Sequence, residues 1–195
     1  NAEVGPGWCL VHATWCDDGE LADLAASGAV AGLCPTTEAN LGDGVFGAQT
    51  FLAAGGSLAI GTDSHVGVDP AEELRLLELV QRLFHRRRNV LGGKGRRPAR
   101  TLLDRAIVGG NQALGQPAGH LVAGKAADLV ALRGDHPRLV GHGPETILDA
   151  WVFGAGAGAV SDVFVGGRRV VKEGRHFARD EIGARFAAAA GELWP

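Results

Sequence analysis

Residues 57–65 read SLAIGTDSH, and this stretch decides the fold because a short apolar run ends directly at polar side chains. The apolar residues 57–60 predict a buried strand, and Asp63 follows the point where that strand stops. Residues 8–14, WCLVHAT, repeat the arrangement, with His12 at the end of an apolar run. Parallel α/β folds, and (β/α)8 barrels above all, build their chemistry at the carboxyl ends of strands. The two stretches together predict a parallel sheet that carries a hydrolytic site.

Strands and helices alternate through the first 115 residues. A helix is expected between Asp17 or Asp18 and Gly28, because an acidic N-cap and a glycine C-cap bracket apolar residues at helical spacing. The next strand, residues 29–34, is stopped by Pro35, and short apolar strands of this kind indicate a sheet buried on both faces. Further helices are predicted at residues 48–54, from Pro70 through Phe84, and at residues 100–108.

The organisation changes near residue 115, where short β-rich runs replace the alternation. The last two runs flank a Gly166-Gly167 turn and predict a hairpin. We therefore expect three segments: an α/β part over residues 1–115, a β-rich part over 116–178, and a helical end over 179–195. The predicted β-rich runs are 129–132, 150–153, 163–165 and 168–171, and the final amphipathic helix is predicted at 180–194.

The composition is that of an ordinary soluble globular chain, with 195 residues, 46% hydrophobic and 21% charged. The net charge of −3 gives no bulk attraction to nucleic acid, and no apolar run approaches the roughly 18 residues that span a membrane. The three cysteines lack CxxC spacing, which argues against disulfides and favours a reducing cytoplasm. Because the chain has no methionine and opens at Asn1 without a signal sequence, we expect the C-terminal part of a longer protein.

His12 and Asp63 are the candidate catalytic residues, and Asp63 is also the candidate metal ligand. Each has a structural alternative, since Asp63 can cap the following helix and His12 can be a satisfied structural group. Their spacing leaves room for two βα units, which places them on strands two apart and facing one mouth. His65 is either a third participant or a support for its loop. The loop 36–40 either shapes the site or caps a helix.

The basic cluster between Arg86 and Arg100 has no interleaved aromatic residues for base stacking. We therefore assign it to a solvated face, or to a contact between the subunits of a homodimer, rather than to nucleic-acid binding. The glycine-rich runs 92–95 and 154–158 lack the sequence context of a phosphate loop or a dinucleotide fingerprint. Neither run is taken as a binding site.

Three stretches together resemble the amidohydrolase superfamily: His12 at one strand end, residues 34–44 (CPTTEANLGDG) at the next, and residues 61–65 (GTDSH) at the third. They are similar to strands six, seven and eight of its (β/α)8 TIM barrel. Residues 119–130 (GHLVAGKAADLV) and 160–171 (VSDVFVGGRRVV) resemble the stretch where these chains leave the barrel and complete a small β-sandwich. The resemblance implies an α/β fold, in which the C-terminal part of the barrel is followed by part of that sandwich.

Within the superfamily, the loop after the middle strand and residues 71–77 and 86–91 resemble the N-formimino-L-glutamate deiminases of histidine degradation. The resemblance implies one zinc ion per complete site, with Asp63 as its ligand in this chain and His12 beside the reacting water. It further implies a small-molecule substrate, and a missing N-terminal part of the barrel that carries a His-x-His, another His, an acid/base Glu and substrate-binding arginines. The alternatives are a deaminase of a purine or pyrimidine base and a non-catalytic fragment.

Overall fold

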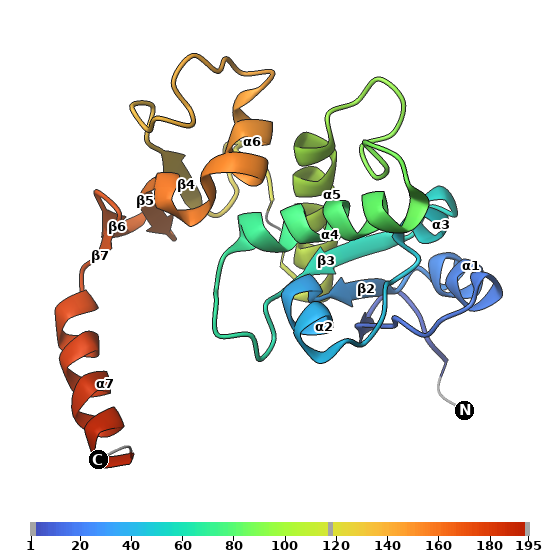
Figure 1. Cartoon of the computed structure of the whole chain (residues 1–195), viewed down its shortest axis with the longest axis horizontal. Coiled ribbons are helices and arrows are strands. Elements are labelled where there is room, and N and C mark those ends of the chain that lie inside the picture. The colour runs from blue at the N-terminus through green and yellow to red at the C-terminus, as the bar shows by residue number, and fades with distance from the viewer. Residues whose placement is uncertain (1–2, 117–118, 194–195) are drawn as a thin grey trace.

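The part of the chain that the structure describes forms two β-sheets, one parallel and one antiparallel (Figure 1). The computed structural model of the chain describes residues 3–116 and 119–193. The strand order is β1-β2-β3 in the parallel sheet and β4-β5-β6-β7 in the antiparallel sheet. The parallel sheet and the hairpin of β5 and β6 confirm two predictions from the sequence. The strands are β1 (Cys9–Val11), β2 (Val30–Leu33), β3 (Ser57–Ile60), β4 (Leu129–Leu132), β5 (Val160–Val165), β6 (Arg168–Lys172) and β7 (Arg175–His176).

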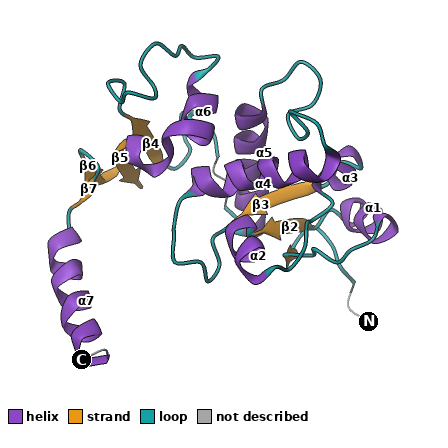
Figure 2. Cartoon of the chain, in the orientation of Figure 1, coloured by secondary structure: helices purple, strands orange, loops and turns teal. Residues whose placement is uncertain are grey.

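Helices connect the consecutive strands of the first sheet, as a parallel arrangement requires (Figure 2). Asp17 caps the first helix through a capping box with Glu20, and Gly28 ends that helix in the left-handed conformation, as predicted. No helix within the described residues is long and apolar enough to cross a membrane. The helices are α1 (Asp18–Ser27), α2 (Pro35–Leu41), α3 (Ala48–Ala53), α4 (Pro70–His85), α5 (Pro98–Ala113), α6 (Ile147–Ala150) and α7 (Arg179–Leu193).

The hydrophobic core lies around the parallel sheet. All four residues of β2 are buried between β1 and β3, and helix α5 packs against β2 as well as β3. Phe51 of α3 is fully buried, which contributes about 1.5–3 kcal/mol through apolar area removed from water. Helix α5 approaches β3 so closely that a Cβ on Gly109 would lie 2.0 Å from the Leu58 carbonyl oxygen. Glycine is therefore required where α5 crosses the strand that leads to Asp63.

Two aspartates tie the antiparallel part to the parallel part. Asp69 caps α4 by accepting the Ala71 amide, and its other carboxylate oxygen accepts the amide of Ala157. Asp149, in the short helix α6 between β4 and β5, accepts the Ala99 amide at the start of α5. The first amides of a helix have no acceptor within the helix and need one elsewhere. In α4 and α5 a carboxylate accepts such an amide and also joins the two parts of the chain.

Two predictions of local structure are wrong. Residues 36–40 were predicted as a loop, but they belong to α2, which starts at Pro35 because proline is favoured in the first turn. Residues 150–153 were predicted as a β-rich run, but they close α6 and enter a π-helical turn, Trp151–Ala155. That turn buries Val152 and lays Phe153 under the Arg82 guanidinium of α4. A helical turn satisfies its own backbone hydrogen bonds while it presents these apolar groups to α4.

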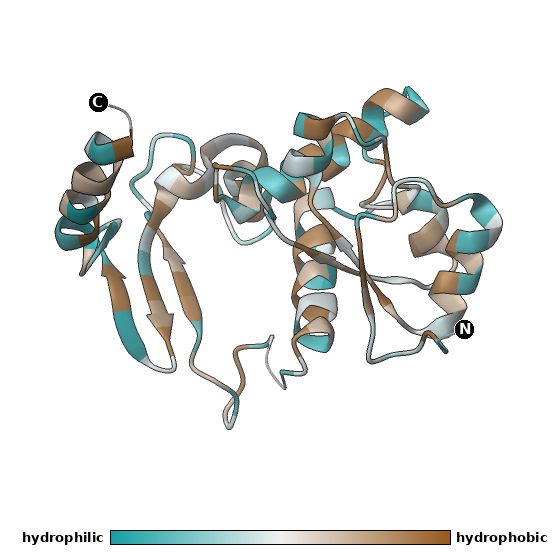
Figure 3. Cartoon of the chain, turned by 90° about the horizontal axis from the view of Figure 1, so that it is seen from below, coloured by the Kyte–Doolittle hydropathy of each residue, from teal (hydrophilic) through white to brown (hydrophobic). Residues whose placement is uncertain are grey.

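The antiparallel sheet and α7 are much more exposed than the parallel sheet. Apolar residues run along strands of both sheets (Figure 3), but the residues of β4 are only half-buried or exposed. Helix α7 projects away from the rest of the chain (Figure 1), and none of its residues over 179–193 is buried. This helix was predicted to end at Trp194, which lies outside the described residues. Helix α5 was predicted over residues 100–108 and is longer, since it spans Pro98–Ala113.

Candidate active site

The carboxyl ends of the parallel strands gather the predicted site residues. His12 directly follows β1, and its amide donates to the Gly32 carbonyl of β2 over 2.8 Å. Asp63 lies three residues beyond β3, after Gly61, whose amide donates to the Leu33 carbonyl over 2.9 Å. These two hydrogen bonds continue the pairing of β1 with β2 and of β2 with β3 beyond the ends of β1 and β3. The structure therefore brings His12 and Asp63 to the same edge from strands two apart.

The imidazole of His12 lies between two carboxylates. Its Nδ1 is 3.2 Å from Oε1 of Glu38, and its Nε2 is 3.9 Å from Oδ2 of Asp63. The backbone around this contact is unusual, since His12, Ala13 and Asp63 all have positive φ, at 66°, 50° and 47°. Left-handed non-glycine residues cost of order 1–3 kcal/mol each and concentrate at functional sites, where surrounding contacts hold them.

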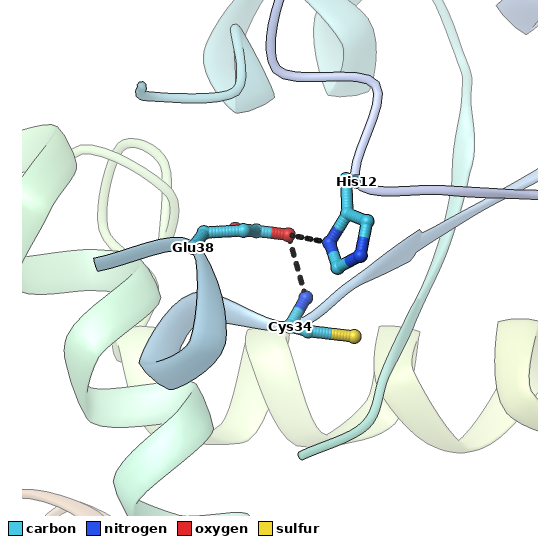
Figure 4. Close-up of side chains that lie close together, drawn as sticks. All are labelled: His12, Cys34 and Glu38. Atoms are coloured by element: carbon cyan, nitrogen blue, oxygen red, sulfur yellow. Dashed lines mark hydrogen bonds and ion pairs between the residues drawn. The ribbon is translucent and has the colours of Figure 1, made fainter. Parts of the chain in front are cut away.

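Glu38 is the residue whose role the sequence left open. Its side chain is buried, and Oε1 accepts the Cys34 amide over 2.7 Å and lies 3.2 Å from Nδ1 of the His12 ring (Figure 4). Burial raises the pKa of the Glu38 carboxyl, while the Cys34 amide and His12 act against that rise. The signal in the sequence was an acidic residue in the first turn of a helix that follows a strand. The hydrogen-bond partners of the Glu38 carboxylate could not be inferred from that position in the sequence.

Thr37 and His65 organise the loop that carries Asp63. The Thr37 hydroxyl donates to the Thr62 carbonyl over 2.7 Å and accepts the His65 amide over 3.2 Å. The His65 ring in turn accepts the Gly67 amide at Nδ1 over 3.0 Å. His65 therefore supports its loop, which is one of the two alternatives drawn from the sequence.

Thr36 attaches the same helix turn to α4. Its amide donates to Oε2 of Glu73 over 2.9 Å, and its hydroxyl donates to the other oxygen of that buried carboxylate. Asn40, further along α2, is exposed. The first turn of α2 thus contacts α4 through Thr36, the Asp63 loop through Thr37 and the end of β1 through Glu38.

Donor atoms suited to a metal are present at this edge. Asp63 offers a partly exposed carboxylate beside the Nε2 of His12, and oxygen and imidazole nitrogen are donors that zinc accepts. His12, Cys34 and Glu38 also have donor atoms within 4.8 Å of one another. Burial, Glu38 and Asp63 raise the pKa of the Cys34 thiol to about 11, so it holds its proton at neutral pH. The Asp63 carboxylate fits zinc without any need for a thiolate, and His12 lies beside it.

A sizeable cavity lies away from this edge. It has a volume of about 750 Å³ and opens at the amino end of β3, where Ser57, Arg100 and Arg105 are among its lining residues. In barrels the amino ends of strands serve stability, and chemistry lies at the carboxyl ends. We therefore place the candidate site at His12 and Asp63 despite the size of the other cavity.

Residues 5–170 match the amidohydrolase family. The chain belongs to the amidohydrolase family. It is 51% identical to formimidoylglutamate deiminase of Pseudomonas aeruginosa, over 99% of this chain and 43% of that protein. It is 29% identical to 5-methylthioadenosine/S-adenosylhomocysteine deaminase of Pyrococcus furiosus, over 87% of this chain and 39% of that protein. The chain thus spans less than half the length of these amidohydrolase relatives.

Solved amidohydrolase structures have the same fold over this length. An amidohydrolase from Brucella melitensis superposes with a TM-score of 0.93 and 46% identity, covering 100% of this chain and 43% of that one. An adenosine deaminase from Xanthomonas campestris with bound zinc superposes with a TM-score of 0.81 and 25% identity, covering 96% of this chain and 42% of that one. Zinc is therefore bound by at least one protein that shares this arrangement of strands.

Proposed function

We propose that this chain supplies strands six, seven and eight of an amidohydrolase (β/α)8 barrel, followed by part of its β-sandwich. The complete enzyme hydrolyses N-formimino-L-glutamate to N-formyl-L-glutamate and ammonia, as a step of histidine degradation in the cytoplasm. The observation that carries this proposal is the convergence of His12 and Asp63 at one sheet edge, in a chain 51% identical to a formimidoylglutamate deiminase. The parallel order β1-β2-β3 supports the barrel assignment.

The proposed chemistry adds water to the formimino carbon and expels ammonia. One zinc ion per complete site, held in this chain by Asp63, would supply Lewis-acid activation of the water. The Asp63 carboxylate accepts a proton from the attacking water as the C–O bond forms. His12 presents Nε2 to the same position, where its lone pair accepts a hydrogen bond that orients the attacking water. The C–N bond to the terminal nitrogen then breaks as the carbonyl forms, and that nitrogen leaves as ammonia with the proton taken up by Asp63 and the proton that the tetrahedral hydroxyl gives up.

The remaining parts of the site are proposed to lie upstream of this chain. A catalytic zinc usually takes three protein ligands and water, and Asp63 supplies one. We expect the upstream coding sequence to contain a strand ending in His-x-His and a later strand with a His-x-x-Glu pattern. A reading frame with neither pattern would remove the hydrolase assignment.

A second candidate function is deamination of a purine or pyrimidine base. It is favoured by the 29% identity to a 5-methylthioadenosine/S-adenosylhomocysteine deaminase and by the superposition on an adenosine deaminase. The same edge of the sheet would serve either substrate, because both reactions add water to a carbon and expel ammonia. The substrate-binding residues distinguish the two functions, and we propose that these residues lie upstream of this chain.

The test is an assay of the full-length protein, meaning this chain together with its upstream coding sequence. Ammonia release should be measured from N-formimino-L-glutamate and, separately, from 5-methylthioadenosine and adenosine. We expect turnover of the first compound only, loss of turnover on chelation and recovery with zinc. Turnover of a nucleoside alone would establish the second function, and turnover of none would support a non-catalytic role. Light scattering of the same preparation tests the proposed homodimer.

A further inference from the structure

We propose that Glu38 is the positioning residue of His12: it takes the proton-bearing Nδ1 as a hydrogen-bond donor and so leaves the lone pair of Nε2 facing Asp63. The inference rests on the proposed function, since it assigns His12 its form in that reaction. It goes beyond that function because it states which ring nitrogen carries the proton and which side chain decides it.

The direction of the hydrogen bond follows from what Oε1 of Glu38 already does. This oxygen accepts the Cys34 amide over 2.7 Å, so it is an acceptor at that point (Figure 4). An ionised carboxylate has no proton to donate, and the Nδ1 of His12 lies 3.2 Å from the same oxygen. The Cys34 amide and His12 both favour the ionised carboxylate, and we assign Nδ1 as the donor to it. In a neutral imidazole with a proton on Nδ1, the other nitrogen carries the lone pair.

The position of Nε2 makes this tautomer useful. Nε2 lies 3.9 Å from Oδ2 of Asp63, beyond the range of a direct hydrogen bond. Its lone pair is thus not consumed by Asp63, and it faces the edge of the sheet where a water or substrate would lie. With the opposite tautomer, an N–H would point at the Asp63 carboxylate and would compete with zinc for it.

The surroundings hold Glu38 firmly enough to impose this choice. Glu38 lies in the first turn of α2, and Thr36 in the same turn is bound through two hydrogen bonds to the buried Glu73 of α4. Thr37, which lies between Thr36 and Glu38 in the sequence, is hydrogen-bonded to the loop that carries Asp63. The Glu38 carboxylate is held by the Cys34 amide, and the helix turn that carries it is held by Thr36 and Thr37, so it imposes its geometry on the more exposed ring of His12.

A purely structural role for Glu38 makes a different prediction. In that case Glu38 would serve only the Cys34 amide at the start of α2, and its loss would lower stability without changing His12. Glu73 offers a matched control, because it is a buried carboxylate that binds the same helix turn but does not contact His12. The comparison of Glu38→Gln with Glu73→Gln therefore separates positioning from packing.

The first measurement is nitrogen NMR of the full-length protein labelled in histidine, with His12→Gln used to assign the signals. We expect the wild type, without substrate, to carry its proton on Nδ1 of His12. Glu38→Gln should shift the population toward a proton on Nε2, since a glutamine amide can donate as well as accept. Glu73→Gln should leave the His12 signals in place. A wild-type proton on Nε2, or unchanged His12 signals in Glu38→Gln, would overturn the proposal.

The second measurement is a double-mutant cycle on turnover. Glu38→Gln should lower kcat by about 10–100-fold, the usual cost of losing an orienting partner, with a much smaller change in KM. In a His12→Ala background, Glu38→Gln should cost little more, because its effect passes through the missing imidazole. An equal further loss in that background would contradict the proposal. The NMR result needs no substrate, so failure of the proposed function is distinguishable from failure of this inference.

Discussion

The parallel sheet and the antiparallel sheet of this chain differ in burial and in what they carry. Every residue of β2 is buried, whereas β4 has half-buried ends and an exposed middle. The parallel strands are short and apolar because helices cover them, and their carboxyl ends place His12, Cys34 and Asp63 side by side. The antiparallel strands carry ion pairs such as Arg169 with Asp162. The proposed chemistry is therefore concentrated in the sheet that is more deeply buried.

The difference teaches how the site is held. Left-handed backbone at His12 and Asp63 needs rigid surroundings, and the first turn of α2 provides them through contacts with three elements. The antiparallel part acts at a distance, because Ala157 donates to Asp69, the N-cap of α4, and Asp149 accepts an amide at the start of α5. Changes in the two parts should consequently have different effects, and the following experiments test that contrast.

The largest expected effect is on the 195-residue chain expressed alone. Trp8 and Val11 of the first sheet are about half exposed, and on their outer sides β1 and β3 pair with no strand among the described residues. Open apolar edges favour aggregation, so the chain should aggregate or remain partly molten, bind zinc weakly and release no ammonia. Gel filtration, thermal melting and the ammonia assay measure this. A soluble, cooperatively melting, active monomer would contradict it.

Next in size is the stability contrast between Phe51→Ala and Phe186→Ala in the full-length protein. Phe51 is fully buried, so its loss should cost about 3–5 kcal/mol of unfolding free energy. Phe186 in α7 is 71% exposed, and its loss should change stability by no more than about 0.5 kcal/mol. Denaturant unfolding measures both. An equal cost at Phe186 would show that α7 is buried against another part of the full-length protein.

Asp63→Asn should lower turnover by at least about 100-fold, because the change keeps the shape but removes the charge that binds metal and accepts a proton. The fold should survive, as circular dichroism would show. The matched control is Asp162→Asn in the antiparallel sheet, whose ion pair with Arg169 does not approach the site. Near-normal ammonia release by Asp63→Asn would reduce Asp63 to a structural residue of its loop.

His12→Ala should lower turnover by a smaller factor than Asp63→Asn and should affect turnover more than substrate binding. The imidazole contacts both carboxylates of the site but is not assigned as a metal ligand. Steady-state kinetics on N-formimino-L-glutamate separate the two parameters. An effect confined to KM would reassign His12 to binding.

The smallest expected effect concerns the cysteines. The Cys34 thiol has a pKa raised from 9.0 to about 11, whereas Cys9 is exposed. Thiol labelling of the full-length protein at pH 8 should therefore modify Cys9 before Cys34, with Cys34 gaining reactivity only as pH approaches 11. Because the folded state holds this proton more tightly than the unfolded state, stability should fall as pH rises between 9 and 11. Cys34→Ser should flatten that slope. Rapid labelling of Cys34 at pH 8 would contradict the argument.

The sequence by itself determined the parallel order, the capping of α1 and the hairpin of β5 and β6. These features depend on local chemistry: apolar runs that end in polar residues, an acidic N-cap, and a pair of glycines. The spacing of His12 and Asp63 also predicted that they would leave strands two apart, because each βα unit has a limited length.

Only the tertiary structure decided what Glu38 and residues 150–153 do. The same acidic residue in a first helical turn can face solvent or a neighbouring strand, and the choice here depends on how α2 lies against the end of β1. Likewise the apolar run at Trp151 could have formed a strand, but α4 offered a surface that a helical turn covers better. Contacts between elements distant in sequence carry no local pattern, and for that reason they emerged only from the fold.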